Sequence, residues 1–144
     1  MTEKAREPLA RLVYIESAEG VWIPFPQPIY ITQKIRTTPR MPFVFGAAET
    51  AKSYIFTLEG IVLSILYEQY DTTNDATGTV SITNMDAATL FSKASLADAT
   101  ATLISVRLGE SLDVPLVNER HTCTVTLSGA PGNAGICYTT IYVV

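Results

Sequence analysis

The one histidine of the chain and a nearby cysteine form the arrangement closest to a catalytic pair. Cys123 follows His121 by two residues. Residues two apart on a strand point to the same face, and an imidazole beside a thiol is the pairing that activates a cysteine nucleophile. The same spacing is ordinary for a histidine beside a core cysteine at the start of a strand. We favour this ordinary interpretation, and we predict no catalytic residue and a protein that is not an enzyme.

The run Asp71–Gly78 (DTTNDATG) contains oxygen donors of the kind that calcium prefers, at Asp71, Asn74 and Asp75. Their spacing does not complete an EF-hand, because no glutamate stands at the twelfth position of such a loop. The same residues are typical of a polar turn between strands. We therefore predict a turn, no metal site and no bound cofactor.

The glycine-rich run Gly129–Gly135 (GAPGNAG) lacks the lysine and the following helix of a phosphate-binding loop. Segments in which apolar and polar residues alternate flank it on both sides, His121–Ser128 before it and Ile136–Val144 after it. We predict that these two segments pair as an antiparallel hairpin, with Gly129–Gly135 as its flexible tip.

The elements that position these residues are predominantly short strands. Segments rich in β-branched and aromatic residues recur between turn residues: Tyr54–Leu58, Ile61–Tyr67, Thr79–Thr83, Thr100–Leu108, His121–Ser128 and Ile136–Val144. Within Thr79–Thr83, Val80 and Ile82 face one side and hydroxyl side chains face the other, which is typical of a half-buried antiparallel strand. The pattern predicts an all-β antiparallel sandwich or barrel of jelly-roll type.

Two segments leave alternatives open. Glu59-Gly60 is either a tight turn or a glycine bulge within one long strand, and a helix through Ile61–Tyr70 competes with the strand prediction. Leu112–Val117 contains Pro115, so it is an edge strand or a loop.

Met85–Leu96 is the best candidate for a short helix, and we expect at most one. Its apolar residues at helical spacing are Ala87, Leu90, Phe91 and Ala94. Either Asn84 or Asp86 would supply the N-terminal cap.

Composition narrows the classes of function. The 144 residues are 47% hydrophobic and only 17% charged, with a net charge of −4, so the chain has no basic face for nucleic acid. The longest apolar stretch, Ile61–Leu66, is too short to span a bilayer, and Met1–Pro8 lacks the apolar core of a signal peptide. We expect a soluble protein made in the cytoplasm, with Cys123 and Cys137 as buried free thiols.

The N-terminal part differs from the rest of the chain. Residues 1–10 read as a flexible polar arm and residues 11–144 as one β domain, with a proline-rich extended segment at 21–42 and a denser β part at 43–144. Prolines at positions 24, 26 and 28 exclude a helix and a central strand. Trp22 and Phe25 in this segment either cover the end of the core or dock on a partner.

In organisation, this small acidic chain resembles the capsid decoration (cement) proteins of tailed bacteriophages. The resemblance rests on the leader Thr2–Leu9, the run VWIPFPQPIYIT, the strand TVSIT and the closing ICYTTIYVV. It implies a β-sandwich or β-barrel that trimerises on a capsid surface and clamps neighbouring major capsid proteins, often with an N-terminal arm. Thr2–Arg11 would be that arm. The candidate interface residues are Thr2, Lys4, Arg6, Leu9, Arg11, Trp22, Ile23 and Phe25.

Two other classes of function compete with this one. A β-sandwich module that binds carbohydrate would need aromatic side chains clustered on one face, and the candidates are Tyr67, Tyr70, Tyr138 and Tyr142. Another virion part, such as a tail, fibre or head–tail connector protein, would share the same composition.

Overall fold

The structure, a computed structural model, describes residues 14–16, 22–24 and 34–144. The chain divides into two units, residues 1–33 and residues 34–144. In the first unit, β1 (Tyr14–Glu16) pairs antiparallel with β2 (Trp22–Pro24), with Ile15 opposite Ile23. The extended backbone predicted for the proline-containing segment is confirmed at Trp22–Pro24.

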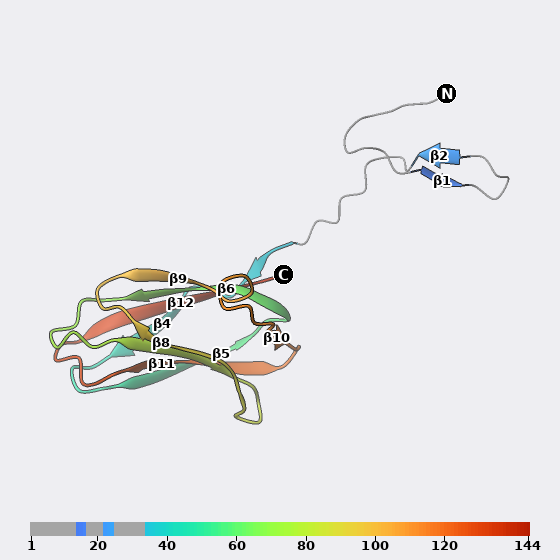
Figure 1. Ribbon diagram of the computed structural model, residues 1–144. Coiled ribbons are helices and arrows are strands. Elements are labelled where there is room, and N and C mark those ends of the chain that lie inside the picture. Colours follow the sequence, from blue (N-terminus) through green and yellow to red (C-terminus); the bar gives the residue numbers. More distant parts are fainter. Residues whose placement is uncertain (1–13, 17–21, 25–33) are drawn as a thin grey trace. The chain divides into compact units, whose positions relative to one another are not determined.

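Residues 34–144 form two antiparallel sheets that lie over one another (Figure 1). In one sheet, β12 (Gly135–Val143) and β6 (Gly60–Gln69) are central. Along its other edge, β12 pairs with β3 (Arg36–Thr37) and β4 (Met41–Phe45). Along its other edge, β6 pairs with β9 (Ala101–Ser105) and β10 (Pro115–Leu116). The other sheet has the order β5 (Ala51–Thr57), β11 (Arg120–Leu127), β7 (Gly78–Thr83), β8 (Thr89–Leu96).

Successive strands mostly alternate between the two sheets. The chain changes sheet from β4 to β5, from β5 to β6, from β6 to β7, from β8 to β9, from β10 to β11 and from β11 to β12, whereas β7 and β8 are neighbours in one sheet. The sheet orders β4-β12-β6-β9 and β5-β11-β7-β8 are those of a jelly roll, which interleaves two Greek keys. The predicted all-β antiparallel sandwich is confirmed. The described residues contain no helix, and therefore none that is long and apolar enough to cross a membrane.

The core lies between the inward faces of the two sheets. Side chains on a strand point to opposite faces in turn, so every second residue of β7, β11 and β12 lies inside. In β6 the alternation is interrupted once, at a register shift against β12 that leaves Val62 and Ile65 both buried. The fully buried aliphatic and sulfur-containing side chains include Val62, Ile65, Val80, Ile82, Cys123, Val125, Cys137, Ile141 and Val143. Both cysteines are free thiols, as predicted.

The predicted hairpin between the last two long strands is wrong. β11 pairs with β5 and β7, while β12 pairs with β4 and β6 in the other sheet. Gly129–Gly135 therefore carries the chain from one sheet to the other. It is also tied down, since Asn74 N–H donates to Pro131 O at 3.0 Å and Gly132 N–H donates to Ala47 O at 3.0 Å. It is not the free hairpin tip that its glycines predicted.

The predicted helix at Met85–Leu96 is also wrong, because Thr89–Leu96 is strand β8. Its register against β7 shifts twice, and Ser95 has a φ of 61°. Of the four apolar residues at helical spacing, Phe91 is buried and Leu90 is half-buried, whereas Ala87 and Ala94 are exposed. The spacing therefore did not mark a buried helical face. Asn84 caps a turn instead of a helix: its Oδ1 accepts the N–H groups of Asp86 and Ala88, each at 2.9 Å.

Three smaller expectations are resolved by the sheets. Ile61–Tyr67 is part of a strand and not of a helix. Glu59-Gly60 is not a bulge within one long strand, because it lies where the chain passes from β5 to β6 in the other sheet, and Gly60 begins β6. Of the two alternatives for Leu112–Val117, the edge strand is confirmed at Pro115–Leu116. The described end of the segment predicted to be extended at 21–42 contains β3 and the start of β4 at Met41.

Gly78 is required by the side chains that lie opposite it. A Cβ at Gly78 would overlap the Tyr67 hydroxyl and lie 2.8 Å from Gln69 Oε1. Tyr67 is fully buried, so it has no free space into which to move. We expect Gly78→Ala to lower the free energy of unfolding by about 1–3 kcal/mol, the usual cost of overpacking, measured by urea denaturation. Gly129→Ala is the control, because a Cβ there meets nothing within 4 Å; an equal loss in both variants would contradict the packing argument.

Candidate functional site

The predicted interface residues fall mainly outside the described part of the chain. Trp22 and Ile23 lie in β2, opposite Glu16 and Ile15 of β1. The remaining predicted interface residues, which lie outside the described residues, are Thr2, Lys4, Arg6, Leu9, Arg11 and Phe25. The structure therefore does not test whether they form one surface.

The His121–Cys123 pair has the predicted geometry and an inert environment. Both side chains face the core and are buried. His121 stacks on Phe56 with ring centroids 5.7 Å apart, and neither of its ring nitrogens has a hydrogen-bond partner. Burial raises the pKa of the Cys123 thiol to about 12, so at neutral pH it is protonated and a poor nucleophile.

The oxygen donors considered for calcium, for which we predicted a turn instead, lie in loops that hydrogen-bond to each other. Within the described residues, no group of three or more histidine, cysteine, aspartate or glutamate side chains is arranged to hold a metal ion. Asp71 O accepts from Asn133 Nδ2 at 2.8 Å, and Asn133 Oδ1 accepts from Thr73 N–H at 3.0 Å. This part of the loop joins the Asp71–Gly78 turn to the Gly129–Gly135 connection.

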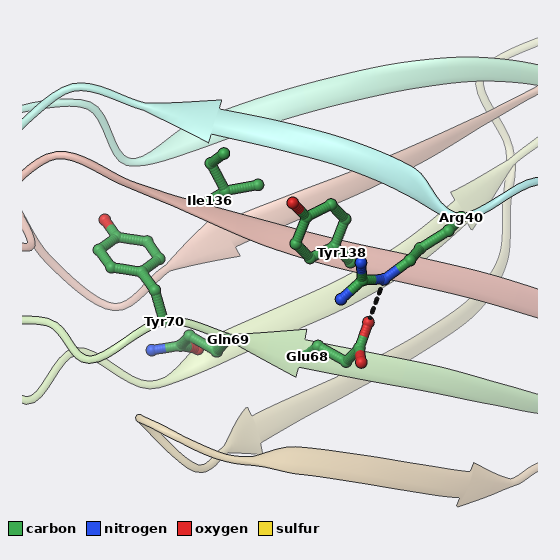
Figure 2. Close-up of a pocket in the computed structure, with 6 residues that line it drawn as sticks. All are labelled: Arg40, Glu68, Gln69, Tyr70, Ile136 and Tyr138. Atoms are coloured by element: carbon green, nitrogen blue, oxygen red, sulfur yellow. Dashed lines mark hydrogen bonds and ion pairs between the residues drawn. The ribbon is translucent and has the colours of Figure 1, made fainter.

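A pocket of about 260 Å³ opens on the outer side of the sheet containing β12 (Figure 2). Its lining residues come from three separate parts of the chain and are Arg40, Glu68, Gln69, Tyr70, Ile136 and Tyr138. The pocket forms because β12 lies between β4, which Arg40 directly precedes, and β6, which carries Glu68 and Gln69. Tyr138 is opposite Pro42 on one side and opposite Glu68 on the other.

An arginine clamps one wall of this pocket. The guanidinium carbon of Arg40 lies 3.6 Å from the centroid of the Tyr138 ring, and Arg40 Nε donates to Glu68 Oε1 at 2.8 Å. The hydrogen bond with Glu68 is the main cause that raises the pKa of Arg40. Figure 2 shows Arg40 between Tyr138 and Glu68, with Tyr70 at the opposite end. The pocket thus presents one carboxylate, one cation and two phenols to a ligand.

The floor of the pocket is fixed by a buried polar network. Tyr67 donates to Gln69 Oε1 at 2.6 Å, and Gln69 Nε2 donates to Ala76 O at 2.6 Å and to Asp98 Oδ1 at 2.8 Å. Thr72 donates to Asp98 Oδ1 through its backbone N–H at 3.0 Å and its hydroxyl at 2.9 Å. Each buried polar group in this network has a partner, which a stable core requires.

A second notable surface is the outer face of the sheet β5-β11-β7-β8, here called the hydroxyl face. Register places its side chains in rows across the strands: Ile55–Thr122–Thr83, Ser53–Thr124–Ser81–Ser92 and Ala51–Thr126–Thr79. Ser53 and Thr124 hydrogen-bond through their hydroxyls at 2.9 Å. The hydroxyl side chains predicted on the outward face of Thr79–Thr83 are confirmed here. Apart from Arg120 at one end, these rows carry no charged side chain.

Apolar side chains accompany the hydroxyl face at one end. Ile55 is 56% exposed and Met85 is 62% exposed, and both line a shallow hollow of about 140 Å³ with Asn84, Arg120 and Thr122. Covering apolar groups and hydroxyls with another protein costs less desolvation than covering charged side chains, and exposed apolar groups that gather at one place are typical of interaction sites.

Comparisons with known proteins assign no role to this surface or to the pocket. Neither the protein-family models nor the curated proteins give a match. Three chains of solved structures match. One belongs to the structure of infectious bursal disease virus Gt strain, with 9% identity and a TM-score of 0.34 over 90% of this chain and 41% of that chain. The chain thus spans about two fifths of that viral chain, and a likeness at this level carries no argument about function.

Asp98 makes the stability of the pocket floor depend on pH. Partial burial opposes ionisation of its carboxyl, but the hydrogen bonds from Thr72, Gln69 and Ala99 outweigh burial and lower its pKa. A lowered pKa in the folded state adds stability above the ordinary pKa of aspartate, and this stability is lost as the pH falls through the folded pKa.

We therefore expect the free energy of unfolding to fall between about pH 5 and pH 2 in the wild type, and to fall less steeply in Asp98→Asn. Asp98→Ala, which strips the acceptor from Thr72 and Gln69, should cost about 1–3 kcal/mol at pH 7. Urea denaturation across this pH series measures both. An Asp98→Asn profile parallel to that of the wild type would contradict the assignment.

Proposed function

We propose that the chain is a structural virion protein that binds the outside of a capsid shell and stabilises it as a homo-oligomer, with a trimer expected. The observation that carries the proposal is the hydroxyl face: an ordered, almost uncharged sheet surface with exposed apolar groups at one end. The jelly-roll order is compatible with it, since viral capsid domains use this architecture, as lectins and cupins do. Fold alone does not carry the function.

Stabilisation of a shell would follow from several contacts acting together. Each copy in an oligomer holds one shell subunit, so rupture requires several interfaces to break at once, and the second contact forms at a high effective concentration. The candidate arm, Thr2–Arg11, would add a further contact from the same chain.

Charge placed in the centre of the hydroxyl face tests this proposal. Thr124 lies on the central strand β11, between Ser53 and Ser81. Purified chain is added to shells of the virus that encodes it, from which the protein has been stripped. We expect the wild type to co-sediment with the shells and to raise their rupture temperature, and Thr124→Lys to lose both effects because the lysine would have to be dehydrated on binding.

Thr140→Lys is the matched control, since Thr140 lies on the outer side of β12, a central strand of the other sheet, and is half-buried like Thr124. It should retain binding. Failure of the wild type to co-sediment, or equal loss in both variants, would overturn the proposal.

A carbohydrate-binding function is the second candidate, and the pocket favours it. Two of the four tyrosines suggested by the sequence, Tyr70 and Tyr138, line this pocket together with Glu68 and Gln69. Of the other two, Tyr67 is fully buried and Tyr142 is half-buried outside the pocket. Polar side chains beside aromatic rings are the usual lining of a sugar site.

This function predicts chemical-shift changes at Tyr70 and Tyr138 when a panel of neutral and acidic monosaccharides is titrated. Tyr138→Ala should abolish them. Tyr142→Ala, on the same strand but outside the pocket, should not. A panel that leaves the Tyr70 and Tyr138 signals unmoved would remove this candidate.

A further inference from the structure

The two sheets present four edges in the described residues, and three of them are blocked or short. β4 contains Pro42, which has no N–H to donate. β8 has two register shifts and a φ of 61° at Ser95. On β9, Ser105 O already accepts the Glu110 N–H at 2.9 Å, so the open part of that edge is confined to Ala101–Leu103. Irregular, short or proline-containing edges of this kind prevent pairing with another chain.

The fourth edge, β5, has none of these features. Its seven residues contain no proline, and its register with β11 is unbroken from Ala51 opposite Thr126 to Thr57 opposite Arg120. Leu127 N–H donates to Thr50 O at 2.7 Å, so the even-numbered residues of this segment are the ones bonded to β11. Because bonding alternates in an antiparallel pair, the backbone N–H and C=O groups of Ala51, Ser53, Ile55 and Thr57 face the open edge.

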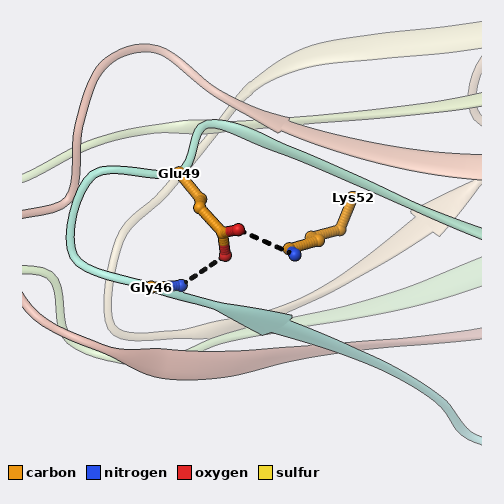
Figure 3. A network of polar contacts seen from close by, with 3 residues as sticks. All are labelled: Gly46, Glu49 and Lys52. Carbon is orange, nitrogen blue, oxygen red and sulfur yellow. Dashed lines mark hydrogen bonds and ion pairs between the residues drawn. The ribbon is translucent and has the colours of Figure 1, made fainter.

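One charged residue, Lys52, lies on β5, and it forms an ion pair with Glu49 in the loop before the strand. Glu49 accepts the Gly46 N–H at 2.7 Å through Oε1 and the Lys52 ammonium at 3.0 Å through Oε2 (Figure 3). The hydrogen bond from Gly46, then that from Lys52, lowers the pKa of Glu49, so this carboxylate stays ionised at neutral pH. A lysine on an edge ordinarily discourages pairing, but here it is paired with Glu49.

We propose that β5 is a self-association edge, at which a second copy of this chain adds its own β5 antiparallel about a twofold axis and joins two sheets into one. The full-length register sets Ala51 opposite Thr57, Ser53 opposite Ile55, and Tyr54 opposite Tyr54 of the second copy. Lys52 then faces Phe56, and no like charges meet. The edge groups of the four odd-numbered residues all gain partners in this register.

The side chains of β5 suit this pairing. Tyr54 is 36% exposed and packs edge-on against Phe43 with ring centroids 6.3 Å apart, so its ring is held in place at the centre of the contact. Aromatic residues opposite each other across strands add about 0.2–1 kcal/mol per pair. Ile55, 56% exposed in the single chain, would be partly covered, and the hydroxyl face would continue across both copies.

This inference stands apart from the proposed function. Pairing about a twofold axis joins two copies, whereas a decoration protein is expected to associate about a threefold axis. If both occur, trimers are linked in pairs into particles of six chains. Shell binding and β5 pairing can therefore fail independently.

Cross-linking tests the register of the full chain directly. In the proposed pairing, Tyr54 and its symmetry mate form a non-hydrogen-bonded pair, with Cα atoms about 4.5 Å apart, within reach of a disulfide. We expect Tyr54→Cys to give a covalent dimer under mild oxidation. Lys52→Cys is the control, since its symmetry mate lies about 13 Å away along the strand. Both variants also carry Cys123→Ala, because Cys123 lies directly opposite Tyr54 on β11 and could form a disulfide with a cysteine at position 54 of the same chain. Cys137, 0% exposed, should remain unreacted. Efficient cross-linking of Lys52→Cys, or none of Tyr54→Cys, would overturn this register.

Blocking the edge tests the association itself, with mass measured by light scattering. Ser53→Pro removes an edge N–H without removing a bond to β11, and Ile55→Lys places charges near each other across the twofold axis. Both variants should halve the number of chains in the particle.

Ser53→Ala and Leu103→Lys are the matched controls, since Leu103 is 63% exposed on the rival edge β9. Both should keep the wild-type mass. A monomeric or trimeric wild type, or dissociation caused by Leu103→Lys and not by Ile55→Lys, would contradict the proposal.

Discussion

The structure depends on the pairing of the C-terminal strand β12 with two strands from much earlier in the chain. Cys137 lies opposite Phe43 on one side and opposite Gln69 on the other. One sheet of the sandwich is therefore incomplete until the end of the chain takes its place. Pairings between residues this far apart in sequence carry a large loop-closure entropy and are typical of slowly folding β proteins. The pocket depends on the same pairing, because β12 brings Tyr138 between Arg40 and Glu68.

Hydrogen bonds within and between loops at one end of the sandwich stabilise the fold in addition to strand pairing. Asp98 gathers Thr72 and Gln69 around a single carboxylate oxygen, and Asn133 joins two loops that lie some sixty residues apart in sequence. Loops with their own hydrogen-bond partners resist local opening. The pocket is thus built on fixed backbone, while the hydroxyl face on the other sheet is built by strand register alone.

The sequence could predict which face of each strand is buried, but it could not predict which strands are neighbours. Alternation at Thr79–Thr83 and His121–Ser128 identified Val80, Ile82, Cys123 and Val125 as inward residues, and all four are buried. The same alternation suits a hairpin and a sandwich crossing equally well, because a period of two specifies a face and says nothing of the partner strand. The hairpin prediction failed for this reason. The helix prediction failed because two small exposed residues, Ala87 and Ala94, completed an apolar spacing in which only Phe91 is buried.

The candidate sites were harder to predict than the fold. Tyr70 and Tyr138 were singled out as aromatic residues, but no local pattern shows that Arg40 lies over Tyr138 or that Glu68 closes the clamp. The open edge of β5 follows from register and from the state of the other three edges, which only the assembled sheets reveal. Six of the eight predicted interface residues lie outside the described residues.

The central structural claim is that β12 lies between β4 and β6 and not beside β11. Cross-strand nuclear Overhauser effects in the isotope-labelled full chain test this claim most directly. The structure predicts backbone contacts from Thr139 to Tyr67 on one side and to Met41 on the other. Backbone contacts between Ile136–Val143 and Thr122–Leu127 in their place would show a hairpin, and would contradict the jelly roll, the pocket and both surfaces argued from it.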